Sequence, residues 1–430
     1  MNQQELPHAR LAQVRLELHR VIVGQERMLD RLLACVLAEG HCLIEGVPGL
    51  GKTLTLSTLA RVMGGTFSRI QFTADLIPAD IVGTRIYRPS SETFDVEPGP
   101  VLANVVLADE INRAPAKVQG ALLEVMQERQ VTVGGRTMAA PRPFIVVATQ
   151  NPIESEGVYP LPEAQRDRFL MRIPIDYPTP AEERQIVHRF EDVAPTASRL
   201  LDPEDVIALQ AAARAVEMDD ATTDYAVRLV LATRDPARYG VPEITGQLEY
   251  GASPRASLGL VRAARAMALL RGRDRATPQD VYDIAYDVLN LRLVLSYAAL
   301  ADGVTVDDVL VRLLKTVPAP AVAGAWQPMA TPAPMGVAAP VAPSAPRPAP
   351  PAFGAPAPVG APATMSVPIA APITFVAPPP MPPPAAISVP AATISVPTAP
   401  FPPAPPFPPA LPTEFGQLPG GVMPAYPAAP

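Results

Sequence analysis

The chain has 430 residues, enough for two or three domains, but its 57 prolines are too many for a uniformly globular protein. The formal net charge of −7 argues against an obligate polyanion binder, because affinity for a phosphate backbone depends on clustered lysine and arginine. Its two cysteines, Cys35 and Cys42, can build neither a disulfide framework nor a four-ligand zinc site.

The N-terminal sequence lacks the pattern of an export signal, since no basic segment is followed by an apolar core. No uninterrupted apolar run reaches the roughly 20 residues that cross a bilayer. With so few cysteines, a reducing compartment fits best. We therefore expect a soluble, cytoplasmic protein without a membrane span.

Between residues 11 and 175, helical stretches alternate with short apolar runs. These runs occupy residues 42–44, 67–72, 105–108, 144–149 and 169–175. Strands separated by helices predict a parallel sheet with right-handed crossovers. We therefore expect an α/β domain over residues 1–178.

The first apolar run leads directly into a phosphate-loop pattern, which is followed by a predicted helix over residues 54–63. The glycines allow backbone N–H groups to point at phosphate, and the helix start adds positive potential. Lys52 is expected to reach the outer phosphates of ATP, and the Thr53 hydroxyl to bind magnesium. A chance glycine-rich turn would rarely supply all these features together. The predicted nucleotide-binding residues are Gly46, Val47, Pro48, Gly49, Leu50, Gly51, Lys52, Thr53 and Leu54.

The apolar run at residues 105–108 ends in two carboxylates, Asp109 and Glu110. Asp109 is positioned to hold a magnesium ion, and Glu110 to orient and deprotonate an attacking water. Acids at a strand end can instead cap the next helix, because they are favoured at its positive end. The phosphate loop earlier in the chain favours the catalytic interpretation.

The run at residues 144–149 finishes at Gln150, Asn151 and Pro152. An amide at the tip of this strand could position water or the γ-phosphate. The alternative is a simple turn, because Asn-Pro commonly starts one. Spacing alone does not separate the two interpretations for Asn151.

After Tyr177, helix signals replace the apolar runs. Three residues with capping side chains each precede a proline and are followed three positions later by an acid: Thr179 with Glu182, Asp202 with Asp205, and Thr277 with Asp280. An N-cap, a proline in the first turn and an acid near the positive helix end together predict a helix start. We expect an all-helical second domain over residues 179–317.

One predicted helix of this domain covers residues 256–270. Its spacings of three and four residues predict a core-facing stripe made of Leu258, Val261, Ala264 and Ala268.

The composition changes sharply near Val317. Residues 318–430 hold 36 of the 57 prolines and only two charged side chains, Arg347 and Glu414. Proline removes backbone donors and fixes φ, so this segment is expected to be a disordered tail. It is either a passive spacer or a docking tail for a partner with an aromatic-lined groove.

Several motifs together resemble the MoxR family of AAA+ ATPases. They are Leu-Ala-Asp-Glu-Ile-Asn-Arg-Ala-Pro at 107–115, the stretch at 121–133, Ala-Thr-Gln-Asn-Pro at 148–152, Tyr-Pro-Leu-Pro-Glu-Ala-Gln at 159–165 and Asp-Arg-Phe at 167–169. The resemblance covers residues 11–314, essentially everything except the tail.

The resemblance implies a nucleotide-binding core and a helical lid, assembled as a hexameric ring with ATP at the subunit interfaces. It makes residues 46–53 Walker A and the acid pair Walker B. Asn151 matches sensor 1, and Arg255 matches sensor 2 on the lid. Arg168 is the candidate arginine finger, with Arg166 as the alternative. A guanidinium offers a fixed fork of donors to phosphate, although an ordinary ion pair is the other interpretation of each arginine.

Three further segments are similar to parts of the family. Residues 21–25, ending at Gln25, resemble the segment beside the adenine. Residues 73–83 and a hairpin at 130–141, centred on Gly134 and Gly135, resemble insertions that face the pore or a partner.

The leading hypothesis is a chaperone-like ATPase that remodels protein clients, with a von Willebrand factor A domain protein as the partner that the resemblance suggests. The alternatives are a metal-chelatase motor subunit, or a nucleotide-gated scaffold with slow hydrolysis whose tail does the work. A nucleic-acid motor is disfavoured, because the two insertions offer only one basic residue, Arg136.

Overall fold

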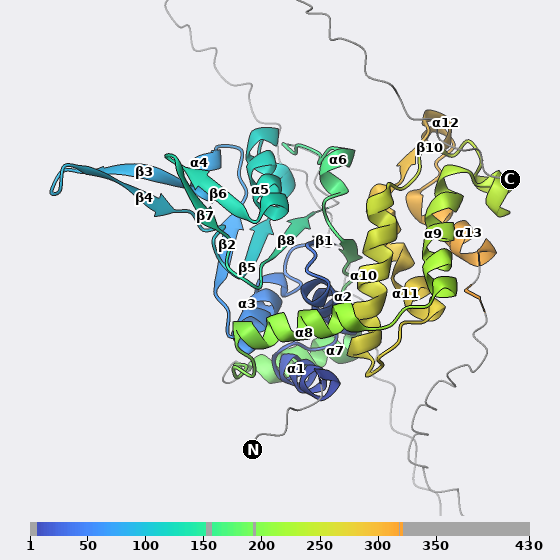
Figure 1. The fold of residues 1–430 in the computed structure, drawn as a ribbon, viewed down its shortest axis with the longest axis horizontal. Coiled ribbons are helices and arrows are strands. Elements are labelled where there is room, and N and C mark those ends of the chain that lie inside the picture. The colour runs from blue at the N-terminus through green and yellow to red at the C-terminus, as the bar shows by residue number, and fades with distance from the viewer. Residues whose placement is uncertain (1–6, 152–156, 192–194, 318, 321–430) are drawn as a thin grey trace, which may run out of the picture. The chain divides into compact units, whose positions relative to one another are not determined.

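The computed structural model describes residues 7–151, 157–191, 195–317 and 319–320 (Figure 1). The expected disordered tail therefore lies outside the described residues except at 319 and 320, and so does Pro152.

A five-stranded parallel sheet lies at the centre of the N-terminal part. It runs in the order β2 (Phe67–Gln71), β5 (Val105–Asp109), β8 (Ile145–Gln150), β1 (Cys42–Glu45) and β9 (Met171–Pro174). All neighbouring pairs are parallel. The five apolar runs correspond to these five strands, so the predicted parallel α/β fold is confirmed. The carboxyl ends of β1, β5 and β8 meet at one edge, where ligands bind in open α/β sheets.

Both faces of the sheet are covered, as the nearly continuous apolar strands require. Along β5, Val105 and Leu107 pack with the helices of one face, and Val106 and Ala108 with those of the other. The first face carries α1 (Pro7–Val21), α2 (Glu26–Leu37) and α3 (Lys52–Val62), and the second carries α5 (Ala116–Glu128).

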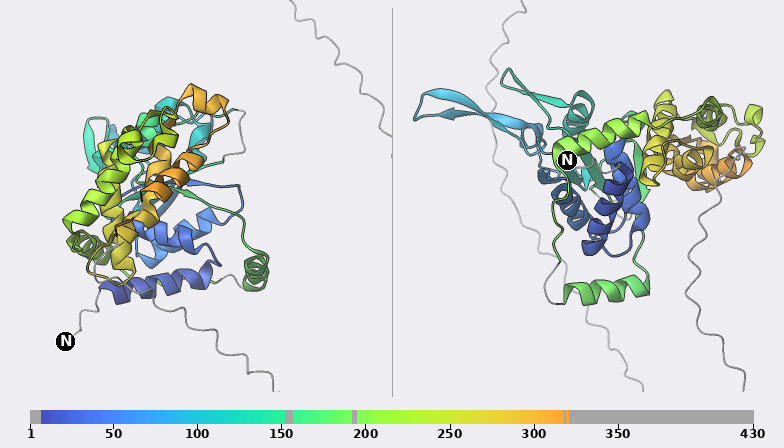
Figure 2. Two further views of the ribbon diagram at one scale, coloured as in Figure 1. Left: turned by 90° about the vertical axis from the view of Figure 1, so that its right-hand side faces the viewer. Right: turned by 60° about the horizontal axis from the view of Figure 1, so that its bottom comes forward.

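Two hairpins leave this core. The one formed by β6 (Gln130–Val133) and β7 (Arg136–Ala139) is the predicted hairpin, and its turn glycines have positive φ. The other follows α4 (Pro78–Val82) and consists of β3 (Gly83–Arg88) and β4 (Thr93–Pro98). It was not predicted, because the expected insertion ended at residue 83. Both hairpins project from the core, β3–β4 farthest (Figures 1 and 2).

Beyond residue 178 the described chain is mainly helical, as predicted. The helices are α7 (Pro180–Phe190), α8 (Pro203–Ala215), α9 (Asp220–Arg234), α10 (Pro254–Leu270), α11 (Pro278–Leu289), α12 (Tyr297–Ala301) and α13 (Val306–Thr316). Thr179, Asp202 and Thr277 are the N-caps of α7, α8 and α11, each with the expected acid three positions later. A two-stranded antiparallel pair, β10 (Leu248–Tyr250) with β11 (Val294–Leu295), was not predicted. The division at residues 178 and 317 stays a prediction.

The predicted buried stripe of α10 is partly wrong. Leu258 is 57% exposed, whereas Ala264 and Ala268 are buried as expected. The helix packs against α2, α8, α9 and α11 at once, so its small residues are buried around most of its circumference. A stripe defined by spacing cannot identify the exposed side of a helix that is enclosed in this way. Among the described helices, none combines the length and the apolarity that crossing a bilayer requires.

Candidate functional site

The loop between β1 and α3 is shaped to receive an anion. Gly49 and Gly51 have φ of 86° and 76°, in the region that favours glycine, and open space surrounds the position of a Cβ at both. A Cβ on Gly46 would lie 2.8 Å from the carbonyl oxygen of Ile175, so only glycine permits this close approach. The loop therefore exposes its backbone N–H groups at the start of a helix, which is an arrangement suited to phosphate.

Lys52 opens α3 and points back across this loop. Its Nζ donates to the carbonyl oxygen of Gly46 at 2.5 Å. Burial lowers the pKa of Lys52, and the carboxylates of Asp109, Glu110 and Glu45 oppose this shift. The ammonium group is thus held inside the loop, near both acids.

The predicted residues converge on one cleft of about 430 Å³. Residues of the phosphate loop form one wall, and the carboxyl ends of β5 and β8 form the other. The predicted residues among its lining are Gly46, Pro48, Gly49, Gly51, Lys52, Thr53, Leu54, Asp109, Glu110 and Asn151. Val47 and Leu50 complete the loop without lining the cleft. Open glycines, one lysine, a threonine and a carboxylate are the groups that bind triphosphate with magnesium, so the residues fit both.

The two acids are ordered by a residue that sequence reasoning did not identify. Thr149, at the end of β8, donates its hydroxyl to Asp109 Oδ1 at 2.6 Å, and its oxygen accepts the N–H of Glu110 at 2.9 Å. Glu110 has a φ of 57°, which turns its side chain out of the strand direction. Parallel pairing of β5 with β8 brings these residues together. The only signal in the sequence was a hydroxyl in the last positions of an apolar run.

Polar residues of β2 contact the same carboxylates and were also missed. Arg69 pairs with Asp109 Oδ2 at 2.6 Å, and Gln71 Nε2 donates to Glu110 Oε2 at 3.0 Å. Arg113 Nε lies 2.8 Å from the same oxygen of Glu110. Both acids thus have cationic or amide partners in this structure.

Gln25 lies beside the phosphate loop but does not line the cleft. It has a φ of 56° and donates to the carbonyl oxygen of Asp176 at 3.2 Å. The neighbouring carbonyl, that of Ile175, is the one in close contact with Gly46. Gln25 is therefore linked to the loop through residues 175–176.

Arg168 and Arg255 lie in a different place. They line a second cavity of about 310 Å³, together with Gly40, His41 and Arg262 among other residues. His41 precedes β1, whereas the phosphate loop follows it, and four residues of strand span about 13 Å. The two arginines are thus at the opposite end of the strands from their own chain's cleft. Arg166 lies 3.6 Å from Glu163 and does not line this cavity.

The fold and the cleft define an AAA ATPase with a lid domain. Residues 41–171 match the family described as "ATPase family associated with various cellular activities (AAA)", and residues 244–313 match the AAA lid domain. The chain is 57% identical to Chaperone MoxR1 of Mycobacterium tuberculosis over 71% of its own length and 81% of that protein's. It is 36% identical to Protein MoxR of Paracoccus denitrificans, over 68% and 90% of the two chains.

A solved structure agrees with these relatives. The crystal structure of a protein assigned as an ATPase from Cytophaga hutchinsonii superimposes with a TM-score of 0.70 at 43% identity, covering 73% of this chain and 96% of that one. The chain belongs to the MoxR family of AAA+ ATPases.

Proposed function

We propose that this ATPase binds magnesium-ATP in the cleft of Lys52, Asp109 and Glu110, and that it uses hydrolysis to remodel protein clients as a chaperone in the cytoplasm. The observation that carries the proposal is the convergence of the phosphate loop and the acid pair on one cleft. A relative that is 57% identical bears the name chaperone. Both cysteines are free thiols, in keeping with a reducing compartment.

Each residue of the cleft has a role in this proposal. The loop N–H groups and Lys52 bind the phosphate oxygens and balance their charge. Thr53 and Asp109 would hold magnesium, which neutralises charge on the phosphates when bound. Glu110 orients the attacking water and accepts its proton, and the Asn151 amide positions that water or the γ-phosphate. Gln25 fixes the chain segment on the adenine side.

Assembly completes the site. Arg168 and Arg255 lie too far along the strands to meet the nucleotide of their own chain, so they are supplied to a neighbouring subunit of a hexameric ring. Each guanidinium offers a planar fork of donors to the phosphates at that interface, and hydrolysis then depends on assembly. Arg168 acts as the finger and Arg255 as the sensor of the lid.

Clients, and a partner with a von Willebrand factor A domain, are expected to contact the projecting hairpins. The β3–β4 hairpin exposes Tyr87 and Phe94, which are 49% and 59% accessible. Exposed aromatic side chains at the end of a projecting element are suited to contact unfolded or partner segments.

Hydrolysis by purified full-length protein tests the proposal. Lys52→Ala should abolish both nucleotide binding and turnover, because the phosphate charge is no longer balanced. Glu110→Gln should abolish turnover while binding persists, because only the proton acceptor is lost. Lys315→Ala on α13 and Glu204→Gln on α8 are matched controls at exposed positions away from the cleft and from Arg168, and they should leave the rate unchanged. Full turnover in both cleft variants would rule the mechanism out.

A further inference from the structure

The carboxylate of Asp167 connects the core to the lid next to Arg168 and Arg255. Asp167 follows α6 (Glu163–Arg166) and leads into β9. Its Oδ2 accepts a hydrogen bond from the hydroxyl of Ser253 at 2.9 Å, and its Oδ1 accepts one from Arg292 Nε at 2.8 Å. Arg255 Nη1 lies 3.9 Å from the same carboxylate. Ser253, Arg292 and Arg255 of the lid thus contact the side chain of Asp167 in the core. We call these contacts the core–lid joint.

Arg292 is buried to an unusual degree for an arginine, with 3% of its side chain exposed. Besides Asp167, it donates to the carbonyl oxygens of Phe169 at 2.6 Å and Leu170 at 3.2 Å, and also to that of Val288. Burial lowers the pKa of Arg292 to about 10, against the opposing effect of Asp167, so the side chain is charged at neutral pH. A buried charge needs this complete set of partners, because an unpaired one would be strongly unfavourable.

The contacts of this joint adjoin both candidate arginines, Arg168 and Arg255, which line the cavity together with Arg129, Arg262 and Arg292. Arg168 is the next residue after Asp167, and its backbone is bracketed by the Asp167 carboxylate and the Phe169 carbonyl that Arg292 binds. On the lid side, Ser253 is the N-cap of α10, and its oxygen accepts the N–H of Arg255 at 3.2 Å. The hydrogen bonds from Ser253 and Arg292 to Asp167, and from Arg292 to the Phe169 carbonyl, therefore restrain the position of Arg168 relative to Arg255.

We propose that Asp167 and Arg292 are positioning residues that hold Arg168 and Arg255 at a fixed separation, so that both arginines reach the phosphates of one nucleotide bound by a neighbouring subunit. The inference rests on the proposed function, because it requires Arg168 and Arg255 to act on the nucleotide of a neighbouring subunit. Neither residue touches the nucleotide. Each acts through the two arginines that it places.

The variant Asp167→Asn keeps the shape of the side chain and removes its charge. In the assembled protein it should reduce kcat by about 10-fold to 100-fold, because a misplaced phosphate ligand costs that much. At a protein concentration too low for assembly, the affinity of its own cleft for a fluorescent ATP analogue should be unchanged, because the cleft lies at the other end of the strands. Asp224→Asn is the matched control, since that acid is exposed on α9, and it should behave as wild type. Weakened nucleotide binding by unassembled Asp167→Asn subunits, or wild-type kcat in their assembly, would overturn the proposal.

Mixed assemblies separate positioning from a general loss of structure. Asp167→Asn subunits keep an intact cleft, and Glu110→Gln subunits keep an intact pair of arginines. Adding inactive Glu110→Gln subunits to the impaired Asp167→Asn subunits should raise turnover, because an intact cleft then meets an intact pair of arginines at some interfaces. Absence of recovery would contradict the inference, whereas a wild-type protein without any turnover would defeat the proposed function itself.

A milder variant covers the case in which Asp167→Asn fails to fold. Ser253→Ala removes one hydrogen bond of the joint and leaves the buried ion pair intact. It should lower kcat by a smaller factor, with a small fall in Tm because Ser253 also caps α10. Wild-type kcat in a folded Ser253→Ala protein, together with wild-type kcat in Arg292→Lys, would show that the joint has no influence on the arginines.

Discussion

Thr149 is the residue on which the geometry of both acids depends. It is almost fully buried and bridges Asp109 and the backbone of Glu110. Thr149→Val keeps the shape but leaves a carboxylate oxygen and an N–H without this partner, at a cost of about 1–3 kcal/mol each. We expect a fall in kcat of roughly 10-fold or more with nucleotide binding retained. Steady-state ATPase assays check this, and Thr149→Ser should restore the rate if the hydroxyl is what matters.

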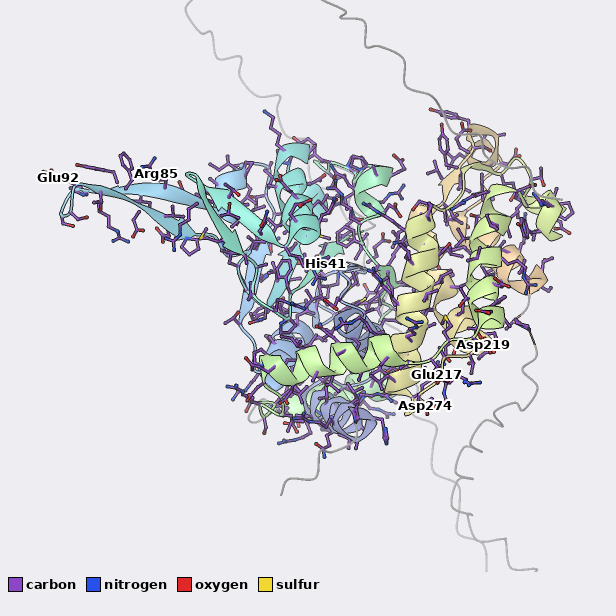
Figure 3. All side chains as sticks on the ribbon, in the orientation of Figure 1. His41, Arg85, Glu92, Glu217, Asp219 and Asp274 are labelled. Atoms are coloured by element: carbon purple, nitrogen blue, oxygen red, sulfur yellow. The ribbon has the colours of Figure 1, made fainter. Side chains whose placement is uncertain are left out.

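His41 lies in the interior of the core (Figure 3) and gives stability a pH dependence. Its Nδ1 accepts the N–H of Val146 at 2.9 Å, and its Nε2 is 3.1 Å from the carbonyl oxygen of Met126. Burial lowers the pKa of His41 from 6.5 to about 4, and Arg129 acts in the same direction. Between these two values the unfolded chain binds the proton and the folded one does not, so stability falls as the pH drops through this window.

The size of this effect can be measured by urea unfolding at two pH values. Between pH 7 and pH 5, His41 should remove roughly 2 kcal/mol of stability. His41→Gln can keep both hydrogen bonds without titrating, so its loss over the same interval should be smaller by that amount. His188→Gln, at an exposed position, should lose as much as wild type. Equal losses in wild type and His41→Gln would contradict the assignment.

At the scale of elements, the β3–β4 hairpin presents a small aromatic surface. Tyr87 and Phe94 face each other across the strands with ring centroids 5.1 Å apart, and the guanidinium of Arg85 lies 4.1 Å above the Phe94 ring. Arg85 and Glu92 mark the extent of this hairpin in Figure 3. The hairpin's contacts are mostly internal, so side-chain changes at its tip should not disturb the core.

The double variant Tyr87→Ser/Phe94→Ser tests the role of this surface. Basal ATPase activity and thermal stability should stay within error of wild type, because neither ring packs into the core. Protection of a thermally unfolded model protein from aggregation should fall, because the apolar contact area is lost. Light scattering measures this. Undiminished protection would assign client contact to another surface.

Prediction from sequence succeeded for elements with a local pattern. The central strands β1, β5 and β8 are apolar along most of their length because both faces are buried, and the capping residues mark helix starts within a few positions. The β3–β4 hairpin was missed because it is exposed on both faces, so its strands show no apolar run. Leu258 was misassigned because an alanine-rich helix offers several equivalent stripes.

The residues of the candidate site also fall into those that a local pattern predicts and those that it does not. Lys52, Asp109 and Glu110 could be predicted because each belongs to a contiguous motif at a strand end. Thr149 and Arg69 could not, because their contacts with Asp109 depend on which strands are neighbours in the sheet. No pattern along the chain gives the distance between Arg255 on the lid and its own phosphate loop.

At the scale of the whole molecule, a buried ion pair holds α11 of the lid against α2 of the core. Asp287 is fully buried and accepts Arg31 Nε at 2.7 Å and Arg27 Nη2 at 2.5 Å. Arg31 also donates to the Asp283 carbonyl at 2.6 Å. The Arg31 side chain is only 10% exposed, whereas the Arg27 side chain is 50% exposed. The ion pair with Arg31 is therefore buried, and the one with Arg27 is open to solvent.

Removing one member of this pair should destabilise the protein strongly. Asp287→Ala leaves the buried charge of Arg31 unpaired, which costs about 3–5 kcal/mol. Arg27→Met removes only the exposed partner and should cost about 1 kcal/mol or less. Urea unfolding measures both, and hydrogen exchange should show α11 opening first in Asp287→Ala. Equal effects of the two substitutions would contradict this description.

The separation of the nucleotide cleft from the arginine cavity along β1 also restricts how copies of the chain can associate. A two-fold dimer can pair the cavity of each partner with the cleft of the other only when both features lie on one face of the chain, whereas a head-to-tail contact pairs them from opposite faces. In a head-to-tail arrangement, every subunit has one occupied and one open end until the last subunit contacts the first. In a closed ring, every arginine pair lies against the nucleotide cleft of a neighbour. A subunit that is defective at only one end would then abolish hydrolysis at one of its two interfaces rather than at both.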